Sequence, residues 1–167
     1  MSREMFVRTA IGQDSHRFAA EDTAGKCILG GIIFPDAPAF LANSDGDVVL
    51  HAVTNAVSGI TAKNVLGARA DALCKSGIRD SAVYLAEALS DLERAGFEPA
   101  HLSVAIEGAR PKIAPHVEEM RENLARILGL SPQDVGITAT TGEGLTAFGR
   151  GEGVSVFAVL TAIPAEI

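Results

Sequence analysis

The stretch SDGDVVLHAVTNAVSGITA, residues 44–62, predicts a long helix that carries one of the four histidines of the chain. Ser44 is a favoured N-cap residue, and Asp45 and Asp47 then lie in the first turn, where the helix dipole favours negative charge. Apolar side chains occupy much of the remaining surface, a pattern typical of a helix packed against a core. We therefore expect His51 to be presented from the surface of a packed helix.

A carboxylate and a second histidine lie upstream, in IGQDSHRF, residues 11–18, which follows a run of strand-forming residues. Asp14 and His16 flank one serine, and on an extended chain such side chains emerge on the same face. Together with His51 they form a suitable catalytic zinc set, because three protein ligands leave the fourth tetrahedral position open. The spacing D-x-H alone is weak evidence, because it also occurs often by chance.

A metal-bound imidazole needs an oxygen partner for its second nitrogen. Asp47 and Asn55 stand four residues before and after His51, so a helix places all three on one face. Either side chain can serve as that partner. Without a metal, a histidine on such a helix is more often a core or surface residue. His101 and His116, the other two histidines, are expected at the surface.

Length and composition fit one enzyme subunit. The 167 residues are a single domain by size, residues 1–167, and 47% hydrophobic residues can fill a core. The net charge of −7 argues against a nucleic-acid partner, and no stretch is long and apolar enough to cross a bilayer. Because the N-terminus MSREMFVRTA has no apolar signal core, we expect a cytoplasmic protein. Cys27 and Cys74 are expected to be unpaired thiols.

The predicted elements follow an α/β order. Strands are expected at 5–11, 102–106, 135–140 and 154–162, with a hairpin at 27–35 that turns at Gly30-Gly31. Beside the helix of residues 44–62, two more helices are expected. One is capped by Asp80, runs through Arg94 and stops at Gly96, and the other runs from Pro115 to Gly129.

A second group of polar residues, ATTGEG at 139–144, ends the third of these strands. Thr140 and Thr141 offer hydroxyl groups, and the glycines offer free backbone N–H groups, so the segment can form a phosphate cradle. From spacing alone, a glycine-rich turn with a solvated Glu143 is the simpler interpretation.

Four ordered segments resemble one enzyme family. They are Asp14-Ser-His16, SDGDVVLHA at 44–52, ARPKIAPHVEEMR at 109–121 and ATTGEGLTAFGRGEG at 139–153. From Arg8 to about Leu160 the chain resembles a divergent member of the 2-C-methyl-D-erythritol 2,4-cyclodiphosphate synthase family, zinc-dependent cyclases of the non-mevalonate isoprenoid pathway. This resemblance implies a mixed four-stranded sheet covered by helices on one side, in a homotrimer with active sites between subunits.

The resemblance also implies the activity of a phosphorus–oxygen lyase. CDP-methylerythritol 2-phosphate would be cyclised to methylerythritol 2,4-cyclodiphosphate with release of CMP. The implied zinc ligands are Asp14, His16 and His51. Glu143 is expected to help hold a second divalent ion, Mg²⁺ or Mn²⁺, on the diphosphate, and to act with Thr141 in catalysis.

Substrate binding is implied for residues at three places in the chain. Asn43 and Ser44 belong to the segment before His51. The residues implied to bind the cytidine and the phosphates of the nucleotide are Ala109, Lys112, Ile113, Thr140 and Thr141. In GRGEG at 149–153, the family arginine lies near the trimer axis beside a cavity that accepts isoprenoid diphosphates. That position is Arg150, for which an intersubunit ion pair with Glu152 is the alternative.

The departures from the family concentrate at the sugar-alcohol end of the implied site. Asn43, Asn55, Thr138 and Gly142 replace a histidine, an aspartate, a lysine and a threonine, respectively. The segment Ile60 to Ser81 contains neither G-D-I-G nor F-P-D-T-D, the loop that grips the methylerythritol hydroxyls and terminal phosphate. The alternative functions are therefore a divergent paralogue acting on another phosphorylated alcohol, or a non-catalytic trimer that binds zinc or nucleotide.

Overall fold

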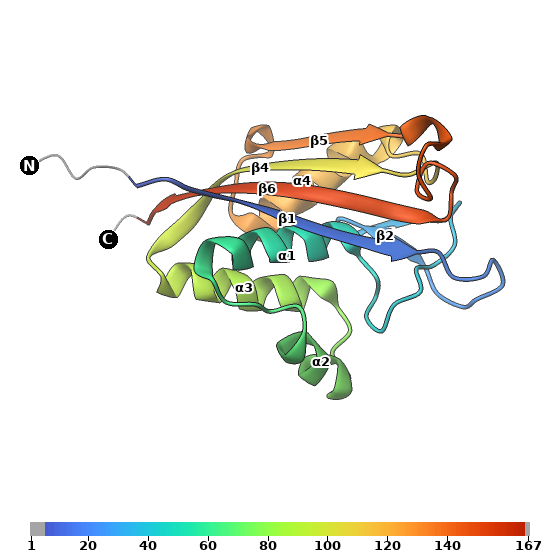
Figure 1. Ribbon diagram of the computed structural model, residues 1–167. Helices are drawn as coiled ribbons and strands as arrows, with labels where there is room; N and C mark the ends of the chain where they lie inside the picture. The colour runs from blue at the N-terminus through green and yellow to red at the C-terminus, as the bar shows by residue number, and fades with distance from the viewer. Residues whose placement is uncertain (1–5, 166–167) are drawn as a thin grey trace, which may run out of the picture.

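Four strands form one mixed sheet in the order β1-β6-β4-β5 in the computed structural model, which describes residues 6–165 (Figure 1). The strands are β1 (Arg8–Arg17), β4 (Phe97–Glu107), β5 (Val135–Thr140) and β6 (Gly153–Pro164). β6 pairs antiparallel with both β1 and β4, whereas β4 and β5 run parallel. The parallel pair requires a crossover, which the chain makes through α4 (Val117–Leu128). The predicted four-stranded mixed sheet is confirmed.

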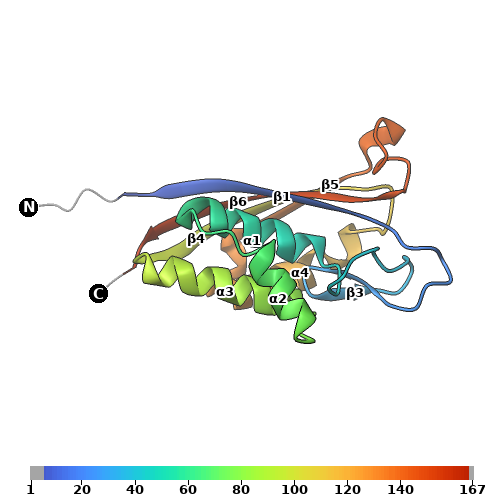
Figure 2. The same cartoon turned by 60° about the horizontal axis from the view of Figure 1, so that its bottom comes forward.

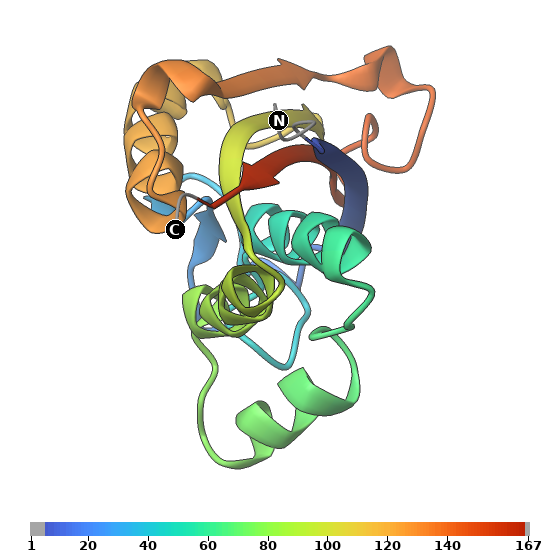
Figure 3. The same cartoon turned by 90° about the vertical axis from the view of Figure 1, so that its left-hand side faces the viewer.

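Three of the helices pack on one face of this sheet, as predicted (Figure 3). α1 (Val48–Thr61) lies against β1 and β6, α3 (Ser81–Arg94) against β4, and α4 against β5. Alternate residues of β6 are buried beneath them: Val154, Val156, Ala158, Leu160 and Ala162. Phe157 and Val159, between these positions, are exposed on the opposite face. Within the described residues, no helix has the length and apolar character to span a membrane.

The hairpin and two of the predicted helices are confirmed. β2 (Cys27–Leu29) and β3 (Ile32–Phe34) meet at Gly30-Gly31, where both glycines have positive φ. The Asp80 side chain caps α3, and Gly96 follows this helix with a φ of 78°. α4 begins after a single 3-10 turn, η1 (Ala114–His116), and ends at Gly129. Two further 3-10 turns are η2 (Pro132–Asp134) and η3 (Gly142–Gly144).

Two strands extend well beyond their predicted ranges, and β6 exceeds its predicted range by one residue at its start and two at its end. β1 continues to Arg17, so Asp14 and His16 lie within the strand, opposite Val156 and Val154 of β6. The predicted strand ended at residue 11, and its first residue, Met5, lies outside the described residues. β4 begins at Phe97, so His101 lies inside this strand and not before it, with its side chain exposed. Pairing with β6 extends both strands, because backbone hydrogen bonds to a neighbour do not depend on apolar side chains.

α1 begins later than predicted, because Asp47 and not Ser44 is its N-cap. The Asp47 carboxylate accepts a hydrogen bond from the backbone N–H of Leu50 at 3.0 Å. Gly46 has a φ of 76°, which takes the chain out of the helical conformation immediately before the cap. Ser44 and Asp45 therefore lie in the preceding loop and not in the helix.

The same carboxylate joins the hairpin to α1. Gly30 and Gly31 donate their backbone N–H groups to Asp47 at 2.9 and 2.6 Å. Asp47 is fully buried, and burial raises its pKa to about 6. A buried carboxylate is costly without hydrogen-bond partners, and the three backbone N–H donors offset the cost of burying Asp47.

A helix that was not predicted, α2 (Ala68–Lys75), lies in the segment between α1 and α3. Its N-cap, Gly67, offers no side chain to the first turn, and most of its residues are polar or small. Arg69 fastens it to α3 by donating to Asp91 at 2.5 Å and to Glu87 at 2.9 Å. The hydrogen bond from Arg69 holds the pKa of Asp91 below its usual value. Tertiary contacts, more than intrinsic propensity, therefore account for this helix.

α1 lies along β1 (Figure 2), and their backbones meet at Gly12. A Cβ on Gly12 would lie 2.0 Å from the carbonyl oxygen of Ala52 and 2.3 Å from the nitrogen of Ala56. Because both atoms belong to the helix backbone, no change of rotamer relieves the clash. The glycine thus permits the close approach that brings His51 over the strand positions of Asp14 and His16.

Gly12→Ala is expected to push α1 away from β1 and to lower the free energy of unfolding by about 3 kcal/mol, as overpacking of a core does. Gly136→Ala is the matched control in β5, because its Cβ would make only an ordinary contact, 3.9 Å from the Leu102 carbonyl oxygen. The control is expected to change stability by less than about 1 kcal/mol. Urea unfolding followed by circular dichroism measures both, and equal effects would contradict this account of Gly12.

Candidate metal centre

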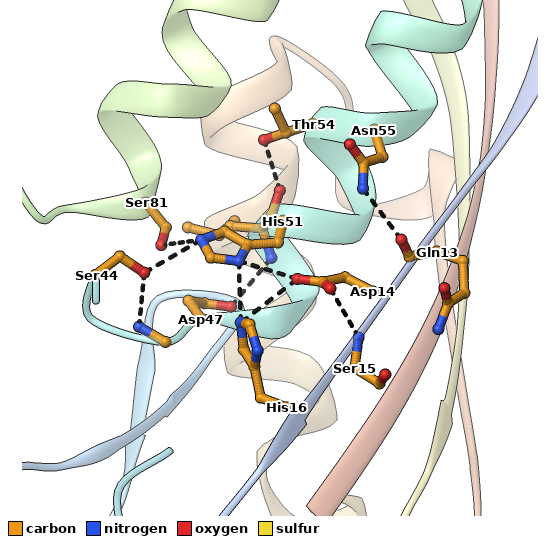
Figure 4. A network of polar contacts seen from close by, with 12 residues as sticks. Gln13, Asp14, Ser15, His16, Ser44, Asp47, His51, Thr54, Asn55 and Ser81 are labelled. Atoms are coloured by element: carbon orange, nitrogen blue, oxygen red, sulfur yellow. Dashed lines mark hydrogen bonds and ion pairs between the residues drawn. The ribbon is translucent and has the colours of Figure 1, made fainter. Parts of the chain in front are cut away.

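Three side chains converge at one end of the contact between β1 and α1 (Figure 4). His51 Nδ1 lies 3.0 Å from Asp14 Oδ2 and 3.1 Å from His16 Nε2. The separation between His16 Nε2 and Asp14 Oδ2 is 3.4 Å. Within residues 6–165 this is the one set of three such side chains whose ligand atoms all lie within 4.8 Å of one another. The predicted trio therefore does meet in space.

The separations fit a tetrahedral metal ion. Ligand atoms about 2.0–2.1 Å from a zinc ion in tetrahedral positions stand roughly 3.3 Å apart. The observed separations of 3.0, 3.1 and 3.4 Å lie on both sides of this value. Two imidazole nitrogens and a carboxylate oxygen that point at one another also need a cation or shared protons between them. The donor set is thus suited to a divalent ion.

The electrostatics keep two of these donors in their ligand forms. Burial raises the pKa of Asp14, but the hydrogen bond with His51 and the nearby imidazoles outweigh it, so the pKa lies below its usual value. Burial lowers the pKa of His16 by more than the Asp14 charge raises it. At neutral pH, Asp14 is therefore ionised and His16 neutral, the states in which both bind metals.

The predicted partner for the second nitrogen of His51 is wrong. The Asp47 carboxylate faces the hairpin, and Asn55 donates its amide to the carbonyl oxygen of Gln13 at 3.0 Å. The partner is Ser81, whose Oγ lies 2.9 Å from His51 Nε2. Ser81 is the first residue of α3, thirty positions along the chain, and local sequence spacing gives no signal for this contact.

A cavity of about 360 Å³ opens beside the three donors. Asn43 and Ser44, predicted to bind substrate, lie in its wall. Ala42 and Asn55 also line it, and the rest of the wall comes from α2 and its surroundings and from α3: Leu66, Gly67, Ala70, Asp71, Cys74 and Tyr84. The segment between α1 and α3, which lacks the motifs expected from the resemblance, therefore lines the metal centre.

A second cavity, of about 610 Å³, adjoins the first and shares Asn43, Asp71 and Cys74 with it. It adds two basic side chains, Lys75 and Arg79. Among the described residues, neither of them forms an ion pair with an acidic group. In a chain with a net charge of −7, unpaired cations beside a metal centre indicate a site for an anion.

The predicted nucleotide-side residues lie elsewhere on the chain. Ala109 and Lys112 line a cavity of about 430 Å³ together with Phe34 and His116. Ile113, which follows Lys112 in the sequence, is buried. Thr140 lines another cavity, of about 370 Å³, between the ends of strands. None of them is in the wall of the metal cavity. One chain alone therefore does not bring the two predicted halves of the site together.

The turn after β5 folds around its threonines. Thr140 Oγ1 accepts a hydrogen bond from Gly142 N at 3.1 Å, and Thr141 Oγ1 accepts one from Glu143 N at 3.3 Å. Glu143 is exposed and has a φ of 50°. The turn thus presents a carboxylate to solvent, away from the three converging donors.

Arg150 forms its ion pair within the chain. Its Nε lies 3.4 Å from Glu152 Oε1, and Arg17 Nη1 lies 3.2 Å from the other oxygen of that carboxylate. All three side chains remain substantially exposed.

The fold and the three converging donors define an α/β protein with a site for a divalent metal ion. Residues 7–163 match the model of the YgbB family, and the chain belongs to this family. It is 54% identical over 159 residues to the 2-C-methyl-D-erythritol 2,4-cyclodiphosphate synthase of Chlamydia muridarum, covering 95% of this chain and 89% of that one. The synthase of the same name from Chlamydia caviae is 50% identical, with coverage of 95% and 90%.

Solved structures agree. A structure described as 2C-methyl-D-erythritol-2,4-cyclodiphosphate synthase in a form bound to CDP is 31% identical, with a TM-score of 0.79 and coverage of 93% and 99%. The Plasmodium vivax synthase structure, 24% identical, has the same fold, with a TM-score of 0.81 and coverage of 96% and 100%.

One divalent ion is expected to bind per chain, and His51→Ala is expected to weaken this binding by more than about 100-fold, the upper end of what outer-shell changes cost. His116→Ala is the control, because this half-buried histidine stands against Phe34 and outside the donor set. Competition with a chelating indicator measures the affinity for Zn²⁺. Equal affinities of the wild type and His51→Ala would exclude the site.

Proposed function

We propose that this chain is a zinc-dependent 2-C-methyl-D-erythritol 2,4-cyclodiphosphate synthase. In this reaction the 2-phosphate of CDP-methylerythritol 2-phosphate attacks the β-phosphorus. A new P–O bond closes the ring, the bond from the β-phosphorus to the bridging oxygen breaks, and CMP leaves. The observation that supports it best is the open three-donor centre in a chain 54% identical to a synthase of this name.

The donor set favours zinc at this centre. Two imidazoles and one carboxylate are typical of catalytic zinc sites, whereas magnesium prefers oxygen ligands. A bound zinc ion supplies Lewis-acid polarisation and orientation of the β-phosphate. Asp14, His16 and His51 would hold the ion at the wall of the 360 Å³ cavity, which is open to a substrate phosphate. Asn43 and Ser44 border that cavity.

The nucleotide half of the proposal rests on the segments at 109–113 and 140–143. Ala109, Lys112 and Ile113 are proposed to contact the cytidine side, next to the 430 Å³ cavity. Thr140 and Thr141 are proposed to face the phosphates. With Thr141, Glu143 is proposed as catalytic and as a ligand of Mg²⁺ or Mn²⁺, since an exposed carboxylate at a turn suits a hard cation that also takes phosphate oxygens.

Assembly as a homotrimer would unite the two halves. Metal donors and nucleotide residues occupy separate cavities of one chain, so a neighbouring chain has to supply one of them. The sheet face opposite the helices also exposes apolar side chains: Ile11 at 63%, Phe157 at 48% and Val159 at 36%. Ile11 and Val159 are paired in register, so these side chains form one patch. Such a patch is typical of an interface. A cytoplasmic location and one domain over residues 1–167 belong to the same proposal.

The 610 Å³ cavity, which contains two basic side chains, suggests a role in substrate binding for the segment 60–81. Lys75 and Arg79 lie beside the metal cavity and have no acidic partner within residues 6–165. We assign to them the phosphate on the alcohol end of the substrate. The alternative function, a paralogue for another phosphorylated alcohol, is favoured by the same segment, because it lacks the family motifs for the methylerythritol hydroxyls. A zinc- or nucleotide-binding trimer without turnover is the non-catalytic alternative.

Purified protein with zinc and magnesium is expected to release CMP from CDP-methylerythritol 2-phosphate. Arg79→Gln is expected to raise KM about tenfold with a smaller change in kcat, because one charge-assisted hydrogen bond is worth roughly 1.5 kcal/mol. The control is Arg126→Gln on α4, whose guanidinium bonds only to Asn123 in the described structure. Binding without CMP release would favour the alternatives, and an unchanged KM would place the phosphate elsewhere.

Light scattering at micromolar concentration is expected to give the mass of three chains of 17.3 kDa. Phe157→Lys places a charge in the apolar patch and is expected to shift the mass toward one chain. Ala86→Lys adds the same charge at an exposed position of α3, on the helical side, and is expected to leave the mass unchanged. A stable monomer of the wild type would contradict the trimer.

A further inference from the structure

Two residues outside the donor set, Asp45 and Ser81, form a hydrogen-bonded chain that ends on His51. Ser81 Oγ lies 2.9 Å from His51 Nε2, on the side of the ring away from Asp14 (Figure 4). The same hydroxyl contacts Asp45 Oδ1 at short range. Ser81 also donates its backbone N–H to Asp45 Oδ2 at 3.1 Å. The carboxylate thus holds both polar groups of the serine.

The direction of these hydrogen bonds follows from counting hydrogens. A serine hydroxyl has one hydrogen, and an ionised carboxylate can only accept. The Ser81 hydroxyl therefore donates to Asp45, and its oxygen presents a lone pair to His51 Nε2. At 2.9 Å two lone pairs would repel, so Nε2 must carry the hydrogen and donate it.

This arrangement selects one tautomer of His51. With the hydrogen on Nε2, a neutral imidazole has its free lone pair on Nδ1. Nδ1 is the atom that lies 3.0 Å from Asp14 Oδ2 and 3.1 Å from His16 Nε2. The ligand atom is therefore ready for a metal without any rearrangement. Ser44 Oγ, 3.4 Å from Nε2 and engaged by Gly46 N, is a weaker second acceptor.

Further contacts fix both members of this hydrogen-bonded chain, Ser81 and Asp45. Ser81 is fully buried at the start of α3. Asp45 donates its own N–H to the carbonyl oxygen of Arg79 at 2.9 Å, and its Oδ1 accepts from Asp47 N at 3.1 Å. The loop before α1 and the start of α3 are thus joined around the His51 ring. Little freedom remains for the ring to turn its other nitrogen toward the cavity.

We propose that Ser81 and Asp45 are positioning residues for the metal centre. They fix the tautomer and orientation of His51 so that Nδ1 is the ligand atom, and they thereby raise the affinity for the metal ion. The consequence for catalysis rests on the proposed function, whereas the tautomer and the affinity do not depend on the substrate. Outer partners of this kind typically change metal affinity by about 10–100-fold.

The test combines metal binding with the state of the imidazole. Ser81→Ala is expected to weaken Zn²⁺ binding by about 10–100-fold in competition with a chelating indicator. Ser81→Thr keeps the hydroxyl and is expected to restore most of the affinity. Ser131→Ala is the matched control, because that exposed serine only caps η2. Asp45→Asn replaces one of the two carboxylate oxygens that accept hydrogen bonds from Ser81 with an NH₂ group. This variant is also expected to weaken Zn²⁺ binding.

Nitrogen NMR of ¹⁵N-histidine protein without metal supplies the second readout. In the wild type, His51, assigned by comparison with His51→Ala, is expected to show hydrogen on Nε2 alone. In Ser81→Ala it is expected to show a mixture of tautomers. Hydrogen on Nδ1 in the wild type, or Zn²⁺ affinity within twofold of the wild type in Ser81→Ala, would overturn the proposal.

If Ser81→Ala does not fold, the wild-type tautomer still decides the question. Absence of CMP release would refute the proposed function and leave both of these measurements unaffected.

Discussion

The contact between the backbones of β1 and α1 at Gly12 is the constraint on which the metal centre depends. The donors come from two elements, and only this close approach brings His51 within 3.1 Å of the donor atoms on the strand. Any side chain at Gly12 would meet backbone atoms of Ala52 and Ala56. Because a helix cannot move without moving all its residues, a packing requirement in the core also sets the geometry of the site.

The loop before α1 serves the fold and the site through two carboxylates, the fully buried one of Asp47 and the half-buried one of Asp45. Asp47 collects three backbone N–H groups and joins the hairpin to the helix. Asp45, two residues earlier, joins the start of α3 to the same loop through Ser81. Buried polar groups are costly unless all are paired, so these networks hold one arrangement of the loop and disfavour others. His51 inherits its orientation from that arrangement.

The residues proposed to act in catalysis lie at separate places on the single chain. The three converging donors adjoin the basic cavity, whereas Ala109, Lys112 and Thr140 line other cavities, and within residues 6–165 apolar side chains are exposed on one face of the sheet. The segment 60–81 departs from the family motifs, yet it builds the wall of the metal cavity through α2. Membership in the YgbB family and 54% identity to a synthase indicate that this wall works within the family chemistry.

Local signals in the sequence were sufficient for α3, α4 and the hairpin, whereas His51 was grouped with Asp14 and His16 through the family resemblance. Asp80, Gly96, Gly129 and Gly30-Gly31 act on their immediate neighbours, and the D-x-H spacing places two donors on one face of any extended chain. Only the tertiary structure decided the cap at Asp47, the length of β1, the helix α2 and the pairing of His51 with Ser81. Each of these depends on a partner far away in the chain, such as β6 for β1 and Arg69 with Asp91 for α2. Periodicity and spacing describe neighbours along the sequence, whereas burial and hydrogen bonding select among groups that only folding brings together.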